Sequence, residues 1–273
     1  MTTLNTGYYQ DFEEFEKCFE LQKEVFQLSD KDTLPPIFLN LLSRNNPRTG
    51  FAIGAFLKES NDLVGYFLNI AGVDNKTIYG MSLGVKPSFR EKNLGLNLFL
   101  YLKKEALQYD VKKWYGIFEV LEGNLGNLYF NKLGMKGIKY EKEPYIIFND
   151  KFPVDKVLIE WDLELSVIND YIDKKLMKIQ FRELVKEYPI LDNTNYNNED
   201  KVLIQIPCNL LGLKQSNINE AIKWRISTRN LFDEFINRKK FIITKFYSNE
   251  NESNKNFYLL EKQKNKKQNF ISK

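Results

Sequence analysis

The segment between residues 77 and 120 constrains the fold of this chain more than any other part. Thr77–Val85 and Lys113–Val120 are short, apolar and rich in residues that favour strands, whereas apolar residues from Gly95 onward recur at helical spacing. A helix that connects two strands of one sheet returns the chain to a parallel neighbour. The pattern therefore predicts a β-α-β unit inside a mixed sheet, which is an α/β fold (α+β mixed sheet).

The flanking residues extend this unit to the element order ααβββαβαβ. We expect two helices first, with apolar faces formed by Phe12, Phe15, Phe19, Val25 and Phe26 and then, after Pro35-Pro36, by Ile37, Phe38, Leu41 and Leu42. Strands follow at Phe51–Leu57 and Leu63–Ala71, and after the β-α-β unit come a helix at Asn124–Leu133 and strands at Met135–Tyr140, Tyr145–Phe148 and Val157–Leu163.

The pattern restarts beyond Glu164. A helix is expected at Val167–Tyr188, followed by a polar linker, a strand at Val202–Pro207, a helix at Asn219–Arg238 and strands at Phe241–Phe246 and Phe257–Leu260. We therefore predict a first domain at residues 1–163, a helix and linker at 164–200, a smaller C-terminal α/β unit at 201–262 and a basic, disordered tail at 263–273.

Composition excludes several kinds of site. The 273 residues include no histidine and only two cysteines, Cys18 and Cys208. Serine–histidine and cysteine–histidine nucleophiles, a disulfide framework and most zinc sites are therefore excluded, and we expect no metal. Any acid–base chemistry must use carboxylates, tyrosine, lysine, the thiols or water. The N-terminus lacks a secretory signal pattern and no long apolar run is present, so we expect a cytoplasmic protein.

The formal net charge of +4 does not indicate a nucleic-acid partner. Five lysines lie in the last twelve residues, which contain no acid, so the rest of the chain is close to neutral. Such a tail is typical of a solvated chain end. We expect neither a nucleic acid nor a membrane as partner, and a homodimer is an option that the sequence leaves open.

The junction from Val85 to Gly95, which reads VKPSFREKNLG, carries the chemistry. It leads from the end of a predicted strand into the start of a predicted helix. The first amides of a helix have no intrahelical acceptor, and the helix dipole adds positive charge there, so this position can bind a phosphate group. The junction therefore predicts a site for a pyrophosphate.

The same junction resembles the acyl-CoA-binding motif of the GNAT acetyltransferase family, Arg/Gln-x-x-Gly-x-Gly/Ala. Arg90 and Gly95 match it, whereas Asn93 stands where the first glycine of the motif lies. Asparagine tolerates a left-handed backbone better than most residues do, so the loop can keep its shape. A second segment, from Val120 to Met135, looks like the family's asparagine and tyrosine motif; Asn124, Lys132, Leu133 and Gly134 match, and Phe130 replaces the tyrosine that often protonates the departing thiolate.

The resemblance implies a GNAT fold and the transfer of an acyl group, most simply from acetyl-CoA or another short acyl-CoA, to the primary amine of a small molecule. The implied catalytic residues are Glu119, Glu122 and Tyr145; for Glu119 the alternative is an ordinary exposed strand residue. The implied cofactor-binding residues are Leu83, Gly84, Val85, Arg90, Lys92, Asn93, Leu94, Gly95, Leu96, Asn124, Asn127 and Phe130. Because Asn93 and Phe130 depart from the family pattern, a non-catalytic acyl-CoA-binding or regulatory protein is the alternative function.

The C-terminal half is similar to an extension carried by one group of GNAT proteins, and residues 152–161 look like the junction to it. Within this half, Arg225 and Arg229 lie one helical turn apart. They are expected either to hold an acidic substrate together or to pair with Glu220 and Asp233 along the helix surface.

Overall fold

The computed structural model divides into two compact units. Unit 1 comprises Met1–Gly116 and Trp161–Ser166, and unit 2 comprises Ile117–Glu160 and Val167–Lys273. This division differs from the predicted domain boundaries, which stay predictions. The structure describes residues 3–44, 46–90, 92–144, 152–165, 181–192, 196–249 and 255–263, so the predicted tail lies outside the described residues except for residue 263.

The sheet of unit 1 confirms the predicted β-α-β unit. Its hydrogen-bonded order is β1 (Leu4–Tyr8), β2 (Gly50–Leu57), β3 (Leu63–Ala71), β4 (Thr77–Val85) and β5 (Lys113–Glu119), the last three residues of β5 belonging to unit 2. The first three pairs are antiparallel, and β4 pairs with β5 in parallel from Thr77 opposite Lys113. Strand β1 was not predicted, because its sequence LNTGY is short and lacks a clear apolar alternation.

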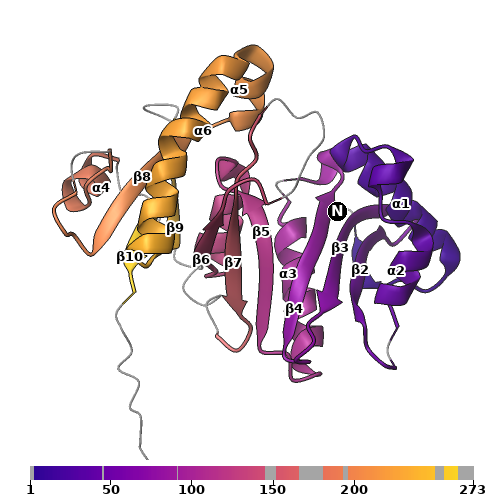
Figure 1. The fold of residues 1–273 in the computed structure, drawn as a ribbon. Helices are drawn as coiled ribbons and strands as arrows, with labels where there is room; N and C mark the ends of the chain where they lie inside the picture. The colour runs from indigo at the N-terminus through magenta and orange to yellow at the C-terminus, as the bar shows by residue number, and fades with distance from the viewer. Residues whose placement is uncertain are drawn as a thin grey trace, which may run out of the picture. The chain divides into compact units, whose positions relative to one another are not determined.

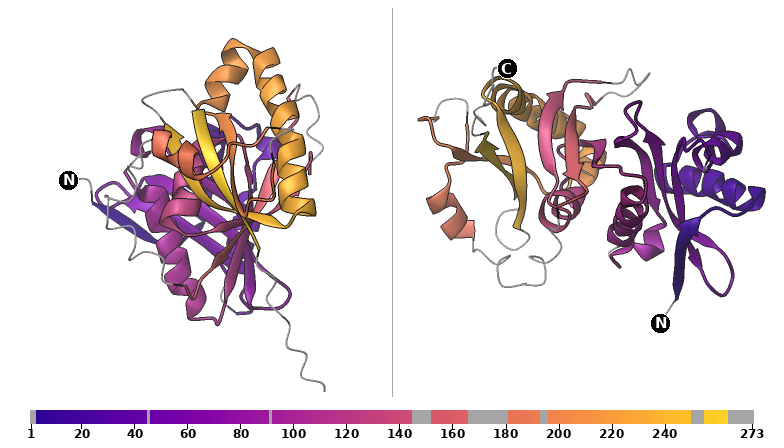
Figure 2. Two further views of the ribbon diagram at one scale, coloured as in Figure 1. Left: turned by 90° about the vertical axis from the view of Figure 1, so that its left-hand side faces the viewer. Right: turned by 90° about the horizontal axis from the view of Figure 1, so that it is seen from below.

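Helices cover both faces of this sheet. Helices α1 (Phe12–Phe26) and α2 (Pro36–Leu42) pack on the face that carries Ala52, Tyr66 and Leu68. Helix α3 (Leu94–Leu107) packs on the other face, where Phe99 lies 4.5 Å from the ring of Phe67. Successive strand residues point to opposite faces, which explains why neighbours such as Tyr66 and Phe67 serve different helices. Figure 2 (right) shows the strands of unit 1 edge-on between these two layers.

Local sequence explains where the first two helices begin. The Asp11 carboxylate accepts the Glu14 amide at 2.9 Å, and the Glu14 carboxylate accepts the Gln10 amide at 2.7 Å, so two amides at the start of α1 are satisfied reciprocally. Helix α2 starts with Pro36 in its first turn, where the missing N–H costs nothing.

The apolar faces predicted for these two helices were partly wrong. Phe12 is 53% exposed and Ile37 is 70% exposed, whereas the unpredicted Leu39 is fully buried. Phe15 and Leu42, which were predicted to face the core, are buried. The reason is that each helix buries one narrow stripe against the sheet, and apolar residues outside that stripe stay in contact with water.

The sheet of unit 2 joins strands from both halves of the sequence. Its order is β7 (Lys156–Asp162), β6 (Lys136–Glu141), β9 (Phe241–Asn249), β10 (Lys255–Lys262) and β8 (Lys201–Pro207), the last two residues of β7 belonging to unit 1. The pairs β6–β7, β6–β9, β9–β10 and β10–β8 are all antiparallel. A strand of the C-terminal half therefore pairs directly with β6.

Alternate residues of β10 serve the two faces of this sheet. Phe257 and Leu259 pack with Leu184 of α4 (Phe181–Glu187). Tyr258 points the other way, where its ring lies 6.2 Å from that of Phe232 at the end of α6 (Ile218–Phe232). Figure 1 shows α4 and α6 on opposite sides of β8.

The remaining helical segments complete unit 2. Helix α5 (Leu210–Ser216) precedes α6, which continues into a π-helical turn, η6 (Asp233–Arg238). The predicted helix at 124–133 is a 3-10 turn, η3 (Gly123–Leu125), followed by a π-helical turn, η4 (Asn127–Lys132). Elsewhere, 3-10 turns occur at Asp30–Asp32 (η1) and Pro87–Phe89 (η2). The predicted strand at 145–148 and the helix over 167–180 lie outside the described residues.

Candidate active site

The junction between β4 and α3 in unit 1 has the form of an anion site. The chain leaves β4 at Val85, makes the turn η2, and enters α3 through Asn93, whose backbone is left-handed at φ 59° and ψ 15°. Asparagine and glycine adopt this conformation most readily among the common residues. Asn93 therefore supplies the backbone turn that a glycine would supply at this position.

The first turn of α3 directs main-chain amides out of the helix end. The Asn97 amide donates to the Asn93 carbonyl at 3.0 Å, which is the first hydrogen bond of the helix. The amides of Leu94, Gly95 and Leu96 precede that bond, and such amides have no intrahelical acceptor. Together with the positive end of the helix dipole, they suit a phosphate group.

Two basic side chains flank these amides. Arg90 donates from Nε to the Val85 carbonyl at 3.2 Å, and Lys92 donates from Nζ to the Ser88 carbonyl at 2.9 Å. The Lys92 ammonium also lies 5.0 Å from the centre of the Phe89 ring. Both side chains are exposed, and in the part of the chain that the structure describes neither forms an ion pair. No carboxylate among the described residues therefore pairs with either of these two charges.

The end of β4 offers backbone groups beside this loop. The register pairs Leu83, Gly84 and Val85 with β3, whereas pairing with β5 among the described residues covers only Thr77–Tyr79. At these three positions, the main-chain groups on one edge of β4 therefore form no ladder hydrogen bonds with β5 among the described residues. Gly84 is required by packing as well, because a Cβ there would lie 2.3 Å from the ring of Tyr66.

Glu119 lies in unit 2 at the end of β5 and is not an exposed strand residue. Its side chain is buried, with 7% of the residue exposed. Its carboxylate accepts the Leu121 amide at 3.0 Å and forms an ion pair with the Arg225 guanidinium. The carboxylate is therefore already used by two donors.

Glu122 lies three residues further along the chain, in the turn closed by the bond from its amide to the Glu119 carbonyl at 3.0 Å. The residue is exposed at the surface, and none of the hydrogen bonds or ion pairs found among the described residues uses its carboxylate. Surrounding protein desolvates the carboxyl group and the Glu119 carboxylate repels its charge; these two effects raise the pKa of Glu122 against the opposing charges of Lys156, Lys214 and Arg225. Glu122 is therefore the more available of the two predicted bases.

The other predicted site residues of unit 2 have packing contacts. The Asn127 side-chain oxygen accepts a hydrogen bond from Asn131 at 3.0 Å, and Asn131 in turn bonds both main-chain groups of Phe246. Phe130 is fully buried, with its ring 5.8 Å from that of Phe118. It offers no exposed surface to a ligand. Asn124 lies in η3, and nothing is described of its side chain; Tyr145 lies outside the described residues.

Arg225, which is buried, and Arg229, which is partly exposed, form ion pairs with buried carboxylates that the sequence did not predict. Arg225 pairs with Glu119, donates from Nε to the Pro153 carbonyl at 2.8 Å and is fully buried. Arg229 donates to both oxygens of Asp155, at 2.8 and 2.7 Å. Among the described residues neither arginine forms a pair with Glu220 or Asp233, because both side chains reach carboxylates outside α6. Glu119 lies 106 positions from Arg225 and Asp155 lies 74 positions from Arg229, so no local spacing could have indicated these pairs.

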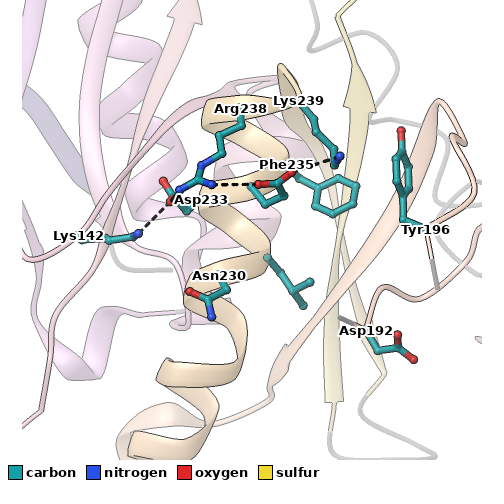
Figure 3. A pocket seen from close by; sticks show the side chains of 10 residues that line it. Lys142, Asp192, Tyr196, Asn230, Asp233, Phe235, Arg238 and Lys239 are labelled. Carbon is teal, nitrogen blue, oxygen red and sulfur yellow. Dashed lines mark hydrogen bonds and ion pairs between the residues drawn. The ribbon is translucent and has the colours of Figure 1, made fainter. Parts of the chain in front are cut away.

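A surface hollow lies elsewhere in unit 2, lined by residues that include Lys142, Asp233 and Lys239. It has a volume of about 480 Å³ and contains none of the predicted site residues. Its charged side chains pair with one another: Lys142 with Asp233 at 2.8 Å, and Lys239 with Glu234 at 3.2 Å. Figure 3 shows these pairs beside Phe235. Because the acidic and basic side chains of this hollow pair with one another and none of the predicted site residues lines it, the hollow is not the site that the sequence indicates.

Two other kinds of feature are absent from the described residues. They contain no group of three or more histidine, cysteine, aspartate or glutamate side chains arranged to hold a metal ion. Among the same ranges, none of the helices combines the length and apolar character that a membrane span requires.

Comparison with known proteins identifies the first part of the chain. Residues 15–135 match the family model described as the acetyltransferase (GNAT) family. No curated protein matches the chain. Similar solved structures include a candidate acetyltransferase from Acinetobacter baylyi (16% identity, 61% of this chain and 97% of that chain, TM-score 0.50) and a probable acetyltransferase from Staphylococcus epidermidis (14% identity, 59% and 99%, TM-score 0.49).

A third solved structure is the PaiA N-acetyltransferase from Thermoplasma acidophilum in complex with coenzyme A (14% identity, 59% of this chain and 99% of that chain, TM-score 0.40). At such identities a likeness concerns the fold. The mixed sheet flanked by helices agrees with the GNAT fold, and the additional C-terminal strands extend it. Residues 15–135 therefore contain an acetyltransferase domain of the GNAT family.

Proposed function

We propose that this protein transfers an acyl group from acetyl-CoA, or another short acyl-CoA, to the primary amine of a small molecule. Acyl transfer in general follows from the family; the donor and the acceptor are the proposal. The observation that carries it is the start of α3, where Asn93 turns the chain so that three consecutive amides precede the first helical hydrogen bond. Arg90 and Lys92 add positive charge at the same loop.

The donor is argued from this loop. A diphosphate bears several oxygen atoms that accept hydrogen bonds, and the amides of Leu94, Gly95 and Leu96 are the matching donors. At Leu83–Val85 the main-chain groups on one edge of β4 do not pair with β5. This supports the expectation that the amide-containing arm of the donor forms hydrogen bonds with that edge, as an additional strand would.

The reaction requires a base and a place for the thiolate. The amine nitrogen attacks the thioester carbonyl, the carbon–sulfur bond breaks, the acyl group stays on nitrogen and the sulfur leaves as thiolate or, once protonated, as thiol. An ammonium acceptor must lose a proton before its attack. We assign this proton to Glu122 instead of Glu119, because the Arg225 ion pair and the Leu121 amide already use the Glu119 carboxylate.

The raised pKa of Glu122 suits this role. A carboxylate accepts a proton better as its pKa approaches the operating pH. Desolvation and the neighbouring Glu119 raise the pKa of Glu122 above that of an ordinary glutamate. Glu122 is also exposed, so a soluble amine can reach it.

Release of free coenzyme A thiol tests the proposal. Purified protein is mixed with acetyl-CoA and a panel of primary amines, and the thiol is measured. We expect release with at least one amine, and loss of release in Glu122→Gln. Tight binding of acetyl-CoA without release on any amine would instead favour the non-catalytic alternative.

Binding variants test the donor site separately. Replacing both Arg90 and Lys92 by alanine should weaken acetyl-CoA binding by about tenfold, or ~1.4 kcal/mol, for each side chain that bonds a phosphate oxygen. Lys104→Ala is the matched control, because Lys104 is an exposed cation in the last turn of the same helix. Equal binding by the double variant and the control would contradict the assigned site.

A further inference from the structure

Two buried polar side chains of β10 have unused hydrogen-bonding atoms. Asn256 Oδ1 and the Tyr258 hydroxyl are shielded from water and have no hydrogen-bond partner among the described residues. Asn256 is 5% exposed and Tyr258 is fully buried. Such atoms destabilise a fold unless something bonds them, so each requires an explanation.

Both side chains belong to one face of β10. They are two positions apart, and residues at that spacing in a strand point to the same side of the sheet. The Tyr258 ring is fixed in an aromatic cluster, 5.6 Å from the ring of Phe130 and 5.4 Å from that of Phe246. Its hydroxyl position is therefore set by packing.

This face of β10 lies against the segment from Phe118 to Gly123. The Asn256 amide touches Gly123, since a Cβ on Gly123 would lie 2.5 Å from Asn256 Nδ2. The ring of Tyr258 lies 6.5 Å from that of Phe118, the residue before Glu119. The charges of Glu119 and Glu122 both act on the Tyr258 hydroxyl and, after burial, raise the pKa of Tyr258 further. The hydroxyl therefore stays protonated at neutral pH.

The chemistry of the three groups selects a ligand. The Asn256 oxygen and the Glu122 carboxylate accept hydrogen bonds, and the Tyr258 hydroxyl oxygen can accept one as well. A primary ammonium group has three N–H donors and a positive charge. An anionic group would instead meet the Glu122 carboxylate, while Glu119 is neutralised by Arg225.

We propose that Asn256, Tyr258 and Glu122 form the subsite for the primary ammonium group of the acceptor. This inference rests on the proposed function and assigns a role to the C-terminal half: strand β10 supplies two of the three groups that recognise the amine. The acyl donor needs neither of them. Removal of either acceptor atom should therefore change amine binding and leave donor binding unchanged.

Binding of a simple amine tests the subsite without turnover. The full chain is titrated calorimetrically with n-butylammonium and with n-butyltrimethylammonium at equal ionic strength. Both probes are cations, but only the first has N–H donors. We expect the wild type to bind n-butylammonium at least tenfold more tightly, and Tyr258→Phe and Asn256→Leu to reduce that preference by at least fivefold. Equal binding of the two probes by the wild type would overturn the proposal.

A matched variant and a second readout separate the outcomes. Tyr247→Phe removes a hydroxyl from the opposite face of the same sheet and should leave the preference unchanged. Because the Tyr258 hydroxyl has no partner among the described residues, Tyr258→Phe should fold normally. In the turnover assay, Tyr258→Phe should raise the KM for the amine without changing acetyl-CoA affinity. Turnover with an unchanged amine KM would refute the subsite alone, whereas absence of acetyl-CoA binding in the wild type would refute the proposed function.

Discussion

Replacing Arg225 by methionine should destabilise the fold through Glu119. The guanidinium of Arg225 is fully buried and pairs with the buried Glu119 carboxylate. In the variant, the Glu119 carboxylate would keep only the Leu121 amide as a hydrogen-bond donor. Asp155 would keep both bonds from Arg229. The variant therefore leaves one uncompensated buried charge, which costs about 3–5 kcal/mol.

A second variant separates removal of the pair from a change in packing. In Arg225→Met with Glu119→Leu, both charges are gone and apolar groups of similar size replace them. Removing a buried pair as a whole is often neutral, so the double variant should recover most of the stability, about 2–4 kcal/mol. Arg229→Met is a milder comparison, because the Arg229 side chain is partly exposed.

Urea unfolding measures these differences. Tryptophan fluorescence reports on Trp224 of unit 2 together with Trp114 and Trp161 of unit 1, and circular dichroism reports helix content in parallel. The buried-charge explanation is refuted if Arg225→Met lies within about 1 kcal/mol of the wild type, or if the double variant is no more stable than the single one.

Three further changes have defined outcomes. Asn93→Val should lower stability by about 1–2 kcal/mol because a β-branched residue resists the left-handed backbone, whereas Asn93→Gly should cost a few tenths; chemical denaturation decides. Gly84→Ala should cost about 1–3 kcal/mol by driving a methyl group into the Tyr66 ring; Tyr66→Val in a paired variant should restore the space, whereas Tyr66→Phe keeps the clashing ring carbons and should not. The pH profile of kcat/KM in the wild type should show an acidic limb above the ordinary glutamate pKa of about 4.3, because activity is lost as Glu122 is protonated. Since the folded-state pKa of Glu122 is raised, its contribution to stability is present at low pH and lost as pH rises through that pKa; this dependence, measured by denaturation at several pH values, should vanish in Glu122→Gln.

The elements with regular patterns could be predicted from the sequence. Three apolar runs separated by polar turns indicated the antiparallel strands β2–β4, and the change of period at Gly95 indicated α3 and its parallel neighbour. The left-handed turn at Asn93 was predicted from the intrinsic tolerance of asparagine. These features are determined by neighbours in sequence, so local rules apply to them.

Features that depend on distant contacts could not be predicted. The ion pair of Glu119 with Arg225 joins positions 106 apart, so the sequence indicated a catalytic Glu119, or else an exposed strand residue, where a buried and paired carboxylate lies. Strand β1 depends on pairing with β2, and its own sequence has no apolar period. Asn131 in η4 bonds both main-chain groups of Phe246, which is more than a hundred residues away, and local spacing gives no sign of this contact.

The central claim is that amides at the start of α3 bind the diphosphate of the acyl donor. Nuclear magnetic resonance of ¹⁵N-labelled protein titrated with coenzyme A observes these amides directly. The account predicts that the signals of Leu94, Gly95 and Leu96 move most, that pantetheine, which lacks the diphosphate, leaves them nearly unchanged, and that both ligands affect the β4 edge. Saturable coenzyme A binding with these three signals unmoved would contradict it.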